Sequence, residues 1–444
     1  MNPTRLAALV PLALLAAGCP PTDDTDSKPD DTGDTDTHVH YDEGCITVDG
    51  DGGYAWLNDA IAVATPGATI EVCAGEFEEA VVVDKSVTIV GAGVGQTLWS
   101  APANEPAFLF LDVEGASLAG MDIASTRSGV QVDTSTDVTL TDLAFYAIPN
   151  YAIDTEDAFG LTIEGCTFDA SQWGAVRVKG GSASIEASAF TDNLGFAIKG
   201  SGGADIDAAG NDISGTMYTE LDPDGGIADG FAIFMDEGGD LTMSANVLHD
   251  NPILAVFAVS GGDVTLDGDS ISGGLFGVYQ AYGDLTLQDV TISDPTEFGV
   301  YYQGPSGERI LMEGSTISGD PEVVSDYAWD EDVLGSIGLY CEADDIEIND
   351  SIIQGYNDFG AFLQPWGSAG ILVMDGVTFQ DNGRRGLFSV ALDASATDIT
   401  ITGVRELDDD YDGAIYVDLP AGWYHGGGSL ALDGGTISDN AGWA

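Results

Sequence analysis

A short motif recurs along most of the chain at a nearly constant interval. Its core is a bulky apolar residue, then Gly or Ala, then an aliphatic residue and, in later copies, an aromatic one, as in 231–234 (Phe-Ala-Ile-Phe). The small residues, taken as anchors, are Gly129, Ala152, Ala175, Ala197, Ala232, Ala255, Gly277, Gly299, Gly338, Gly360, Gly386 and Ala414. The usual step is 22 or 23 residues. A fixed period of this size indicates a stacked array of structural repeats.

Each repeat also contains further strand-like runs. Residues 161–163 (Leu-Thr-Ile) and 264–266 (Val-Thr-Leu) alternate apolar and polar side chains, and a third short run follows, as in 290–292 (Val-Thr-Ile). Alternation with a period of two is typical of a strand with one buried face. Gly, Asp and Asn separate the runs. Two or three short strands in each repeat predict an all-β parallel β-helix, in which each turn pairs with the next.

The chain resembles the right-handed parallel β-helix, or pectin-lyase-like, repeat proteins over residues 43–444. The opening at 46–53 (Ile-Thr-Val-Asp-Gly-Asp-Gly-Gly) and the run at 81–93 carry this resemblance beside the repeat. It implies one single-stranded solenoid of about 12–14 turns. Residues 54–64 have helical spacing and should form a short cap, with Trp56, Leu57 and Ile61 closing the open end. This scaffold carries enzymes, adhesins and structural proteins alike, so the fold does not decide the function.

The first 19 residues have the pattern of a targeting segment. Arg5 precedes a short apolar run, and 15–19 (Leu-Ala-Ala-Gly-Cys) resembles a bacterial lipobox. The resemblance implies cleavage before Cys19 and its lipidation, which would anchor the protein in the bacterial cell envelope, facing the periplasm or the exterior. An ordinary secretory signal is the alternative. Residues 20–42 are rich in Asp, Thr and Pro and should form a disordered acidic tether.

The charge of the chain restricts its partners. The formal net charge is −64, from 75 acidic and 11 basic residues. Nucleic-acid binding requires a basic surface and is excluded, and a polyuronate would be repelled. Solubility in a salty or extracellular setting is one explanation, and calcium binding by carboxylates is another. The calcium candidates are Asp222, Asp224, Asp408, Asp410 and Asp412.

The cysteines fit an exported protein. Cys45 and Cys73 fall on what should be two adjacent strands near the start of the solenoid, so a disulfide between them is plausible. Cys166 and Cys341 lie several turns apart. We expect them to be small buried residues and not a bonded pair.

The residue two positions beyond each anchor should point outward if the residues on either side of the anchor point inward. This outward position is polar in four turns, at Gln131, Asp154, Arg177 and Lys199. It is then aromatic in eight, at Phe234, Phe257, Tyr279, Tyr301, Tyr340, Phe362, Phe388 and Tyr416. An exposed aromatic strip indicates a binding surface, and flat rings beside carboxylates suit sugars. A ladder that serves stability alone, or a facing assignment wrong by one residue, would explain the same pattern.

Longer steps between anchors indicate acidic insertions at 214–230, 318–335 and 404–413. They should project along one edge of the aromatic strip. If the protein is a hydrolase, its acids should be among Asp229, Asp326 and Asp330, separated by about 5–10 Å. No complete catalytic motif is evident. The sequence therefore favours a non-catalytic protein that binds glycan or a surface, with a polysaccharide lyase or glycoside hydrolase, or an adhesive protein that binds protein partners, as alternatives.

The lipobox gives a direct test of anchoring. In Cys19→Ser the thiol that carries the lipid is missing, so the protein should move from the membrane fraction to the soluble fraction after cell breakage. Fractionation followed by immunoblotting measures this. A variant that stays in the membrane fraction would show that the lipobox assignment is wrong.

Overall fold

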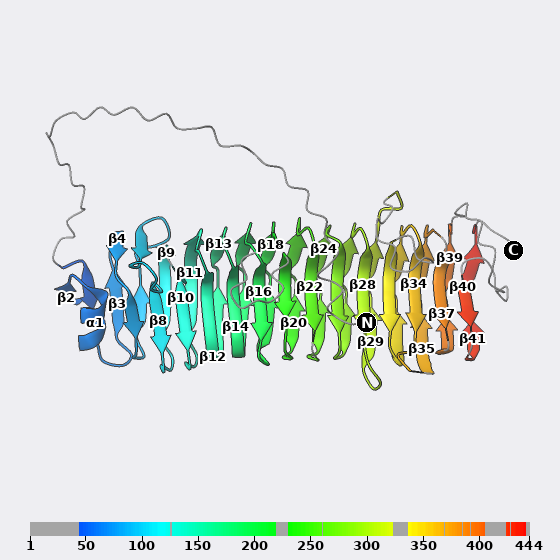
Figure 1. Cartoon of the computed structure of the whole chain (residues 1–444), viewed down its shortest axis with the longest axis horizontal. Helices are drawn as coiled ribbons and strands as arrows, with labels where there is room; N and C mark the ends of the chain where they lie inside the picture. The colour runs from blue at the N-terminus through cyan, green and yellow to red at the C-terminus, as the bar shows by residue number, and fades with distance from the viewer. Residues whose placement is uncertain are drawn as a thin grey trace, which may run out of the picture.

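The protein is a right-handed parallel β-solenoid of about 13 turns, as the sequence predicted. The computed structural model describes residues 44–124, 127–218, 230–259, 261–322, 336–367, 369–383, 385–390, 392–404, 423–426 and 428–440. Figure 1 shows the strands in successive turns along one long axis, with the short helix α1 at the N-terminal end. The targeting segment, with Cys19, and the tether lie outside the described residues.

The strands form three faces that run the length of the solenoid. The first face comprises β5 (Val81–Val83), β8 (Phe108–Leu111), β10 (Val130–Asp133), β12 (Tyr151–Glu164), β14 (Gly174–Glu186), β16 (Phe196–Ser201), β19 (Phe231–Met235), β22 (Leu254–Val259), β25 (Phe276–Ala281), β28 (Phe298–Gln303), β31 (Ile337–Glu342), β34 (Phe359–Gln364), β37 (Arg385–Val390) and β40 (Trp423–Gly426). It contains the anchors, and its strands pair in parallel from turn to turn.

The second face comprises β3 (Thr69–Val72), β6 (Thr88–Val90), β9 (Ser117–Ile123), β11 (Thr139–Tyr146), β17 (Asp205–Ala209), β20 (Leu241–Ser244), β23 (Val264–Asp267), β26 (Leu285–Gln288), β29 (Arg309–Glu313), β32 (Asp345–Asn349), β35 (Gly370–Asp375), β38 (Leu392–Thr397) and β41 (Leu430–Asp433). The long strands β12 and β14 continue into it from the first face.

The third face comprises β4 (Gly75–Glu78), β7 (Thr97–Ser100), β13 (Thr167–Asp169), β15 (Ala189–Thr191), β18 (Asp212–Ser214), β21 (Val247–His249), β24 (Ser270–Ser272), β27 (Thr291–Ser293), β30 (Thr316–Ser318), β33 (Ile352–Gln354), β36 (Thr378–Gln380), β39 (Thr400–Thr402) and β42 (Thr436–Ser438). The ends of β9 and β11 pair within it.

Side chains of one kind stack inside the solenoid. Phe145, Phe168 and Phe190 lie in register on successive turns, with ring centroids 5.0 and 4.6 Å apart. All three are completely buried. Because successive turns present the same position about 4.8 Å apart, a side chain that fits one turn fits against its neighbour in the next. Burial of each such ring stabilises the fold by about 2–3 kcal/mol.

The anchors face the core, which corrects the facing predicted from the sequence. At each anchor the register skips one residue, so that Phe231 pairs with Leu254 and Ile233 with Val256. The chain bends there, and the anchor and the residue after it both point inward. A Cβ on Gly277 would lie 2.6 Å from both the Ile292 side chain and the next turn's carbonyl. The anchors are small because they pack against core and backbone, not because they face solvent.

A short helix closes the N-terminal end, as predicted. Helix α1 (Leu57–Val63) buries Leu57 and Ile61, whereas Trp56 is 55% exposed and does not close the end as we expected. The Glu79 carboxylate accepts hydrogen bonds from backbone N–H groups at the start of the helix, at 2.8 and 3.1 Å. The Lys85 ammonium donates to two carbonyls at its end, at 2.8 and 2.7 Å. Both charges complement the helix dipole.

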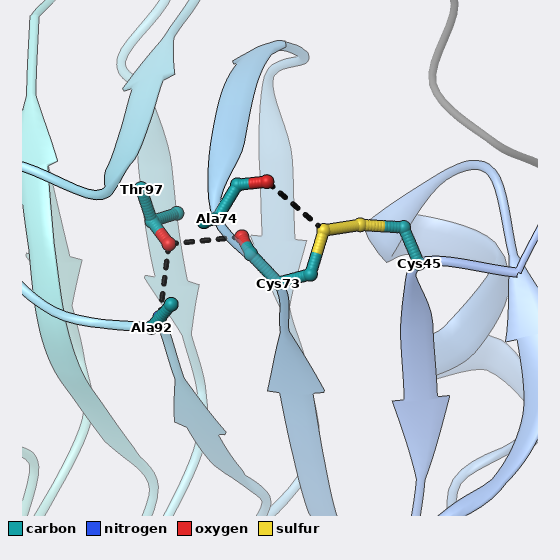
Figure 2. The surroundings of a disulfide bond; sticks show 5 residues. All are labelled: Cys45, Cys73, Ala74, Ala92 and Thr97. Atoms are coloured by element: carbon teal, nitrogen blue, oxygen red, sulfur yellow. Dashed lines mark hydrogen bonds between the residues drawn. A yellow bond between two sulfur atoms is a disulfide. The ribbon is translucent and has the colours of Figure 1, made fainter.

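The disulfide expected between Cys45 and Cys73 is present (Figure 2). Strand β1 (Ile46–Val48) pairs antiparallel with β3 and with β2 (Asp51–Tyr54), and this register brings the two Cα atoms to 5.6 Å. Thr97 donates a 2.9 Å hydrogen bond to the carbonyl of Cys73 and links the bridge to the following turn. A crosslink over 28 residues stabilises the fold by about 3–4 kcal/mol in the chain-entropy account. Cys166 and Cys341 are free and buried.

Two buried tyrosines differ in how their hydroxyl groups are satisfied. The Tyr302 hydroxyl lies 2.8 and 3.0 Å from the carbonyl oxygens of Gly283 and Arg309. The Tyr356 hydroxyl has no hydrogen-bond partner among the described residues, although Tyr356 is completely buried. Its ring occupies space that glycines leave open, since a Cβ on Gly319 would lie 2.9 Å from it. Burial raises the pKa of Tyr356 well above its usual value.

The same substitution at these two tyrosines should have opposite effects on stability. Tyr356→Phe keeps the ring and removes an unsatisfied hydroxyl, so the free energy of unfolding should rise by about 1 kcal/mol. Tyr302→Phe removes the single hydroxyl donor that lies between two carbonyl oxygens and should lower it by about 1–2 kcal/mol. Urea denaturation followed by circular dichroism measures both. Equal losses in the two variants would contradict the assignment of Tyr356 as unsatisfied.

Candidate functional site

An aromatic row runs along the outside of the first face. It comprises Phe234, Phe257, Tyr279, Tyr301, Tyr340, Phe362 and Phe388, in register on successive turns. Neighbouring ring centroids are 4.8 to 5.4 Å apart. These rings form clusters separate from the main core, so the prediction that this position points away from the interior is confirmed.

A second row lies beside the first. It comprises Phe231, Leu254, Phe276, Phe298, Ile337 and Phe359, the residues just before the anchors. We predicted that these side chains would point inward, but they join the outer clusters because the chain bends at the anchor. Edge-to-face contacts connect the rows, for example Phe298 with Tyr301 at 5.3 Å and 88°.

The aromatic row is less open than predicted. Phe234, Phe257 and Tyr301 are only 5, 7 and 4% exposed. The rings of Tyr279 and Tyr301 are parallel within 3°, and those of Tyr301 and Tyr340 within 10°. Their flat faces therefore contact one another. This geometry is that of a stability ladder. Only the half-buried members, Tyr279, Tyr340, Phe362 and Phe388, keep appreciable contact with solvent.

The end of the row differs from the sequence assignment. Tyr416 lies outside the described residues. The strand that pairs with β37 is β40, and its register places Tyr424 opposite Phe388. The last step of the repeat is therefore longer than the anchor at Ala414 implied.

A polar row flanks the aromatic row, and the sequence analysis missed it. Gln303, Glu342 and Gln364 are in register on three turns, two residues beyond the tyrosines and Phe362. Gln303 donates a 2.7 Å hydrogen bond to one Glu342 oxygen, and Gln364 and the Tyr340 hydroxyl donate to the other, the latter at 2.7 Å. We call these four residues the Glu342 network. A search for polar residues four positions beyond the anchors would have found it.

Two exposed rings adjoin the Glu342 network, Trp366 through the sequence and Tyr282 through its backbone N–H, which donates a 2.8 Å hydrogen bond to the Gln303 carbonyl. Tyr282 follows β25 and is 46% exposed, and Trp366 follows Gln364 by two residues and is 42% exposed. Burial, followed by the nearby Tyr282 and Glu342, raises the pKa of Tyr279 to about 12. Burial and then Glu342 raise the pKa of Tyr340 as well. Both tyrosines stay neutral at physiological pH and present hydroxyl groups as hydrogen-bond donors and acceptors.

Charged residues occupy the first face before the aromatic row begins. Arg177 donates two hydrogen bonds to the Asp154 carboxylate, at 2.8 and 3.1 Å, and both side chains are less than a fifth exposed. Lys179 pairs with Glu156 at 2.8 Å in the open. Burial raises the pKa of Asp133, a hydrogen bond from Gln131 opposes this, and the nearby acids Asp154 and Glu156 raise it further.

The remaining acidic candidates cannot be placed. Asp229, Asp326 and Asp330, proposed as possible catalytic acids, lie outside the described residues. So do the calcium candidates Asp222, Asp224, Asp408, Asp410 and Asp412. Within the described part of the chain, no group of three or more His, Cys, Asp or Glu side chains is placed to hold a metal ion. No helix in that part is long and apolar enough to cross a membrane.

Comparison with known proteins identifies the repeat. A family model described as a right handed beta helix region matches residues 128–251 and 231–403, which together make up more than half of the chain. No curated protein matches the sequence.

Several solved structures are similar to this chain at low sequence identity. An exopolygalacturonase from Thermotoga maritima is 11% identical, with 67% of this chain and 82% of that chain covered and a TM-score of 0.42. The A-module of the Azotobacter vinelandii mannuronan C-5 epimerase AlgE4 is 13% identical, with coverage of 86 and 93% and a TM-score of 0.34. An alginate lyase from a Paenibacillus species is 11% identical, with coverage of 84 and 96% and a TM-score of 0.24.

The two ion pairs of the first face should differ in their contribution to stability. Arg177→Met leaves the half-buried Asp154 carboxylate without its donor and should lower the free energy of unfolding by about 2 kcal/mol. Lys179→Met breaks an exposed pair on the same strand and should cost less than about 1 kcal/mol. Denaturation curves of both variants test this. A loss for Lys179→Met as large as that for Arg177→Met would contradict the argument from burial.

Proposed function

Because the chain belongs to the right-handed β-helix family, we propose that it is an elongated extracytoplasmic protein that binds glycan or another surface polymer without catalysing a reaction. A lipid on Cys19 would hold it at the bacterial cell envelope, and the acidic tether would separate the solenoid from the membrane. The observation that supports binding is the Glu342 network, because it lies beside half-buried rings on the outside of a rigid face.

The Glu342 network has the groups that sugar hydroxyls require. Gln303 and Gln364 each offer an amide donor and acceptor, and Glu342 offers carboxylate lone pairs. The three side chains are half-buried and hold one another in place, so little side-chain freedom is lost when a ligand binds. When a sugar displaces water from these side chains, its hydroxyl groups can reproduce the hydrogen bonds that the water made.

Exposed rings at the edge of the Glu342 network can provide apolar contacts for a sugar. The stacked rings of Tyr340 and Phe362 have no free faces for a sugar to cover. Trp366 and Tyr282 are the exposed aromatic side chains that follow the strands here, and their rings can lie against the apolar side of a sugar. A few such contacts give affinities between micromolar and millimolar, which extended polymers raise by repeated binding.

The repeated outer surface suits a polymer better than a small molecule. Successive turns present equivalent positions about 4.8 Å apart along a straight line. A linear chain can therefore contact several turns at once. The described first face offers an extended surface with the network in its C-terminal half, as the positions of β28, β31 and β34 in the solenoid show.

The proposal predicts that substitutions beside the aromatic row reduce binding without unfolding the protein. Glu342→Gln combined with Trp366→Ala should weaken glycan binding at least tenfold, since it removes a charged acceptor and an exposed ring. The measurement is a glycan array followed by isothermal titration calorimetry with the best ligand. Ile371→Ala is the matched control, because Ile371 is an exposed apolar residue on the second face.

Three outcomes decide the proposal. Loss of binding in the double variant, with an unchanged unfolding midpoint and normal binding by Ile371→Ala, supports it. Absence of binding by the wild type to any glycan on the array contradicts it. Unchanged binding by the double variant shows that the Glu342 network is not the site.

A further inference from the structure

Lys199 stands where the charged part of the first face meets the aromatic row. It is on β16, in register with Arg177 on the preceding turn and with Phe234 on the following one. The same face changes here from paired charges to stacked rings. Four of the 11 basic residues of the chain, Arg127, Arg177, Lys179 and Lys199, lie in this part of the sequence. The charge per residue in this part of the sequence is less negative than the chain average.

Lys199 is buried without a polar partner in the described structure. It is 8% exposed, and it makes no hydrogen bond or ion pair with a described residue. The other two described lysines are satisfied, since Lys85 caps a helix and Lys179 pairs with Glu156. The ammonium of a buried lysine is compensated by an opposite charge or by water. In a chain with 75 acidic residues, such a lysine is unusual.

Two rings hold the side chain in place. The Lys199 ammonium lies 5.6 Å from the ring centroid of Phe196 and 5.1 Å from that of Phe234. Cation–π contacts orient an ammonium but leave its hydrogen-bonding capacity unused. The nitrogen is not among the fully enclosed polar atoms without partners, so it keeps contact with solvent. A ligand can reach it from outside.

The surroundings provide no carboxylate for Lys199. Asp154, Arg177 and Lys199 are in register on three successive turns. The Asp154 carboxylate already accepts two hydrogen bonds from Arg177. Two residues further along the strands, Glu156 and Lys179 are followed in register by Ser201, which carries no charge. Asp236 follows β19 on the next turn but makes no ion pair with Lys199 within the described residues. Within the described residues, no carboxylate completes this position.

We propose that Lys199 binds an anionic substituent, a carboxylate or a phosphate, of a saccharide that lies along the first face. The ammonium would donate to the anion while Phe196 and Phe234 keep the lysine extended. This inference rests on the proposed function only for the saccharide part. It accounts for the unpaired lysine and indicates that the chain accepts acidic saccharides locally, although its net charge of −64 repels them at a distance.

A thermal-shift titration of the full-length protein tests the proposal with small probes. Methyl glucuronide carries a carboxylate, glucose 1-phosphate carries a phosphate, and methyl glucoside is neutral. A probe that binds the native state raises the unfolding midpoint by mass action. At about 0.15 M salt, where long-range repulsion is screened, one or both acidic probes should raise the midpoint and the neutral probe should not. The acidic probe that raises the unfolding midpoint more shows whether Lys199 prefers a carboxylate or a phosphate.

Matched variants connect the response to Lys199. Lys199→Met should weaken the response at least tenfold in probe concentration, because it removes the charged donor. Lys199→Arg keeps the charge and should retain the response. Lys179→Met removes the same charge from an exposed position on the preceding turn and should respond like the wild type. Since Lys199 has no ion pair with a described residue to lose, Lys199→Met should be at least as stable as the wild type without probe.

The outcomes separate this proposal from the proposed function. Equal responses in wild type and Lys199→Met, or no response to either acid in the wild type, would overturn it. A response to inorganic phosphate as large as that to glucose 1-phosphate would overturn its saccharide part. A Lys199-dependent response without any glycan-array binding would support the anion site and refute the Glu342 proposal. Binding on the glycan array without a Lys199-dependent response would support the Glu342 proposal and refute the anion site.

Discussion

Registered pairing between successive turns is the constraint on which the rest of the structure depends. Each first-face strand pairs in parallel with its equivalent one turn later, so a side chain always meets the residue at the same position in its neighbours. Inside, this favours like residues in stacks, as with Phe145, Phe168 and Phe190. Where a stack is interrupted, adjacent turns must adjust, and the ring of Tyr356 fits only because glycines leave room for it.

The same constraint acts on the outside of the first face. Aromatic residues repeated at one outward position stack face to face along the axis, and this uses the ring surfaces that a sugar would cover. A repeated aromatic position is thus good for stability and poor as a binding platform. Positions beside the row, where residue types change from turn to turn, are better able to recognise a ligand. The Glu342 network is such a position, and Lys199 lies at the place where the aromatic row begins.

The sequence predicted the architecture well because the architecture is periodic. The step between anchors, the capping helix and the Cys45–Cys73 pair all follow from local pattern and adjacency. The facing of the anchors did not follow, because simple alternation assumes a continuous strand. The register instead skips a residue at anchors such as Ala232 and Ala255. The Glu342 network was missed for a related reason. Its members are ordinary polar residues in sequence, and only the register between turns brings them together.

Net charge alone gives a misleading picture of what this chain can bind. The acids are spread over the many turns, and several occupy left-handed corner positions, such as Asp137 and Asp157. A bound group responds mainly to charges within about a Debye length, roughly 8 Å in physiological salt. On the strand that precedes Arg177, the carboxylate of Asp154 is already paired with that arginine. Distant acids would slow the approach of an anion, but the local pairing of charges decides whether it stays bound.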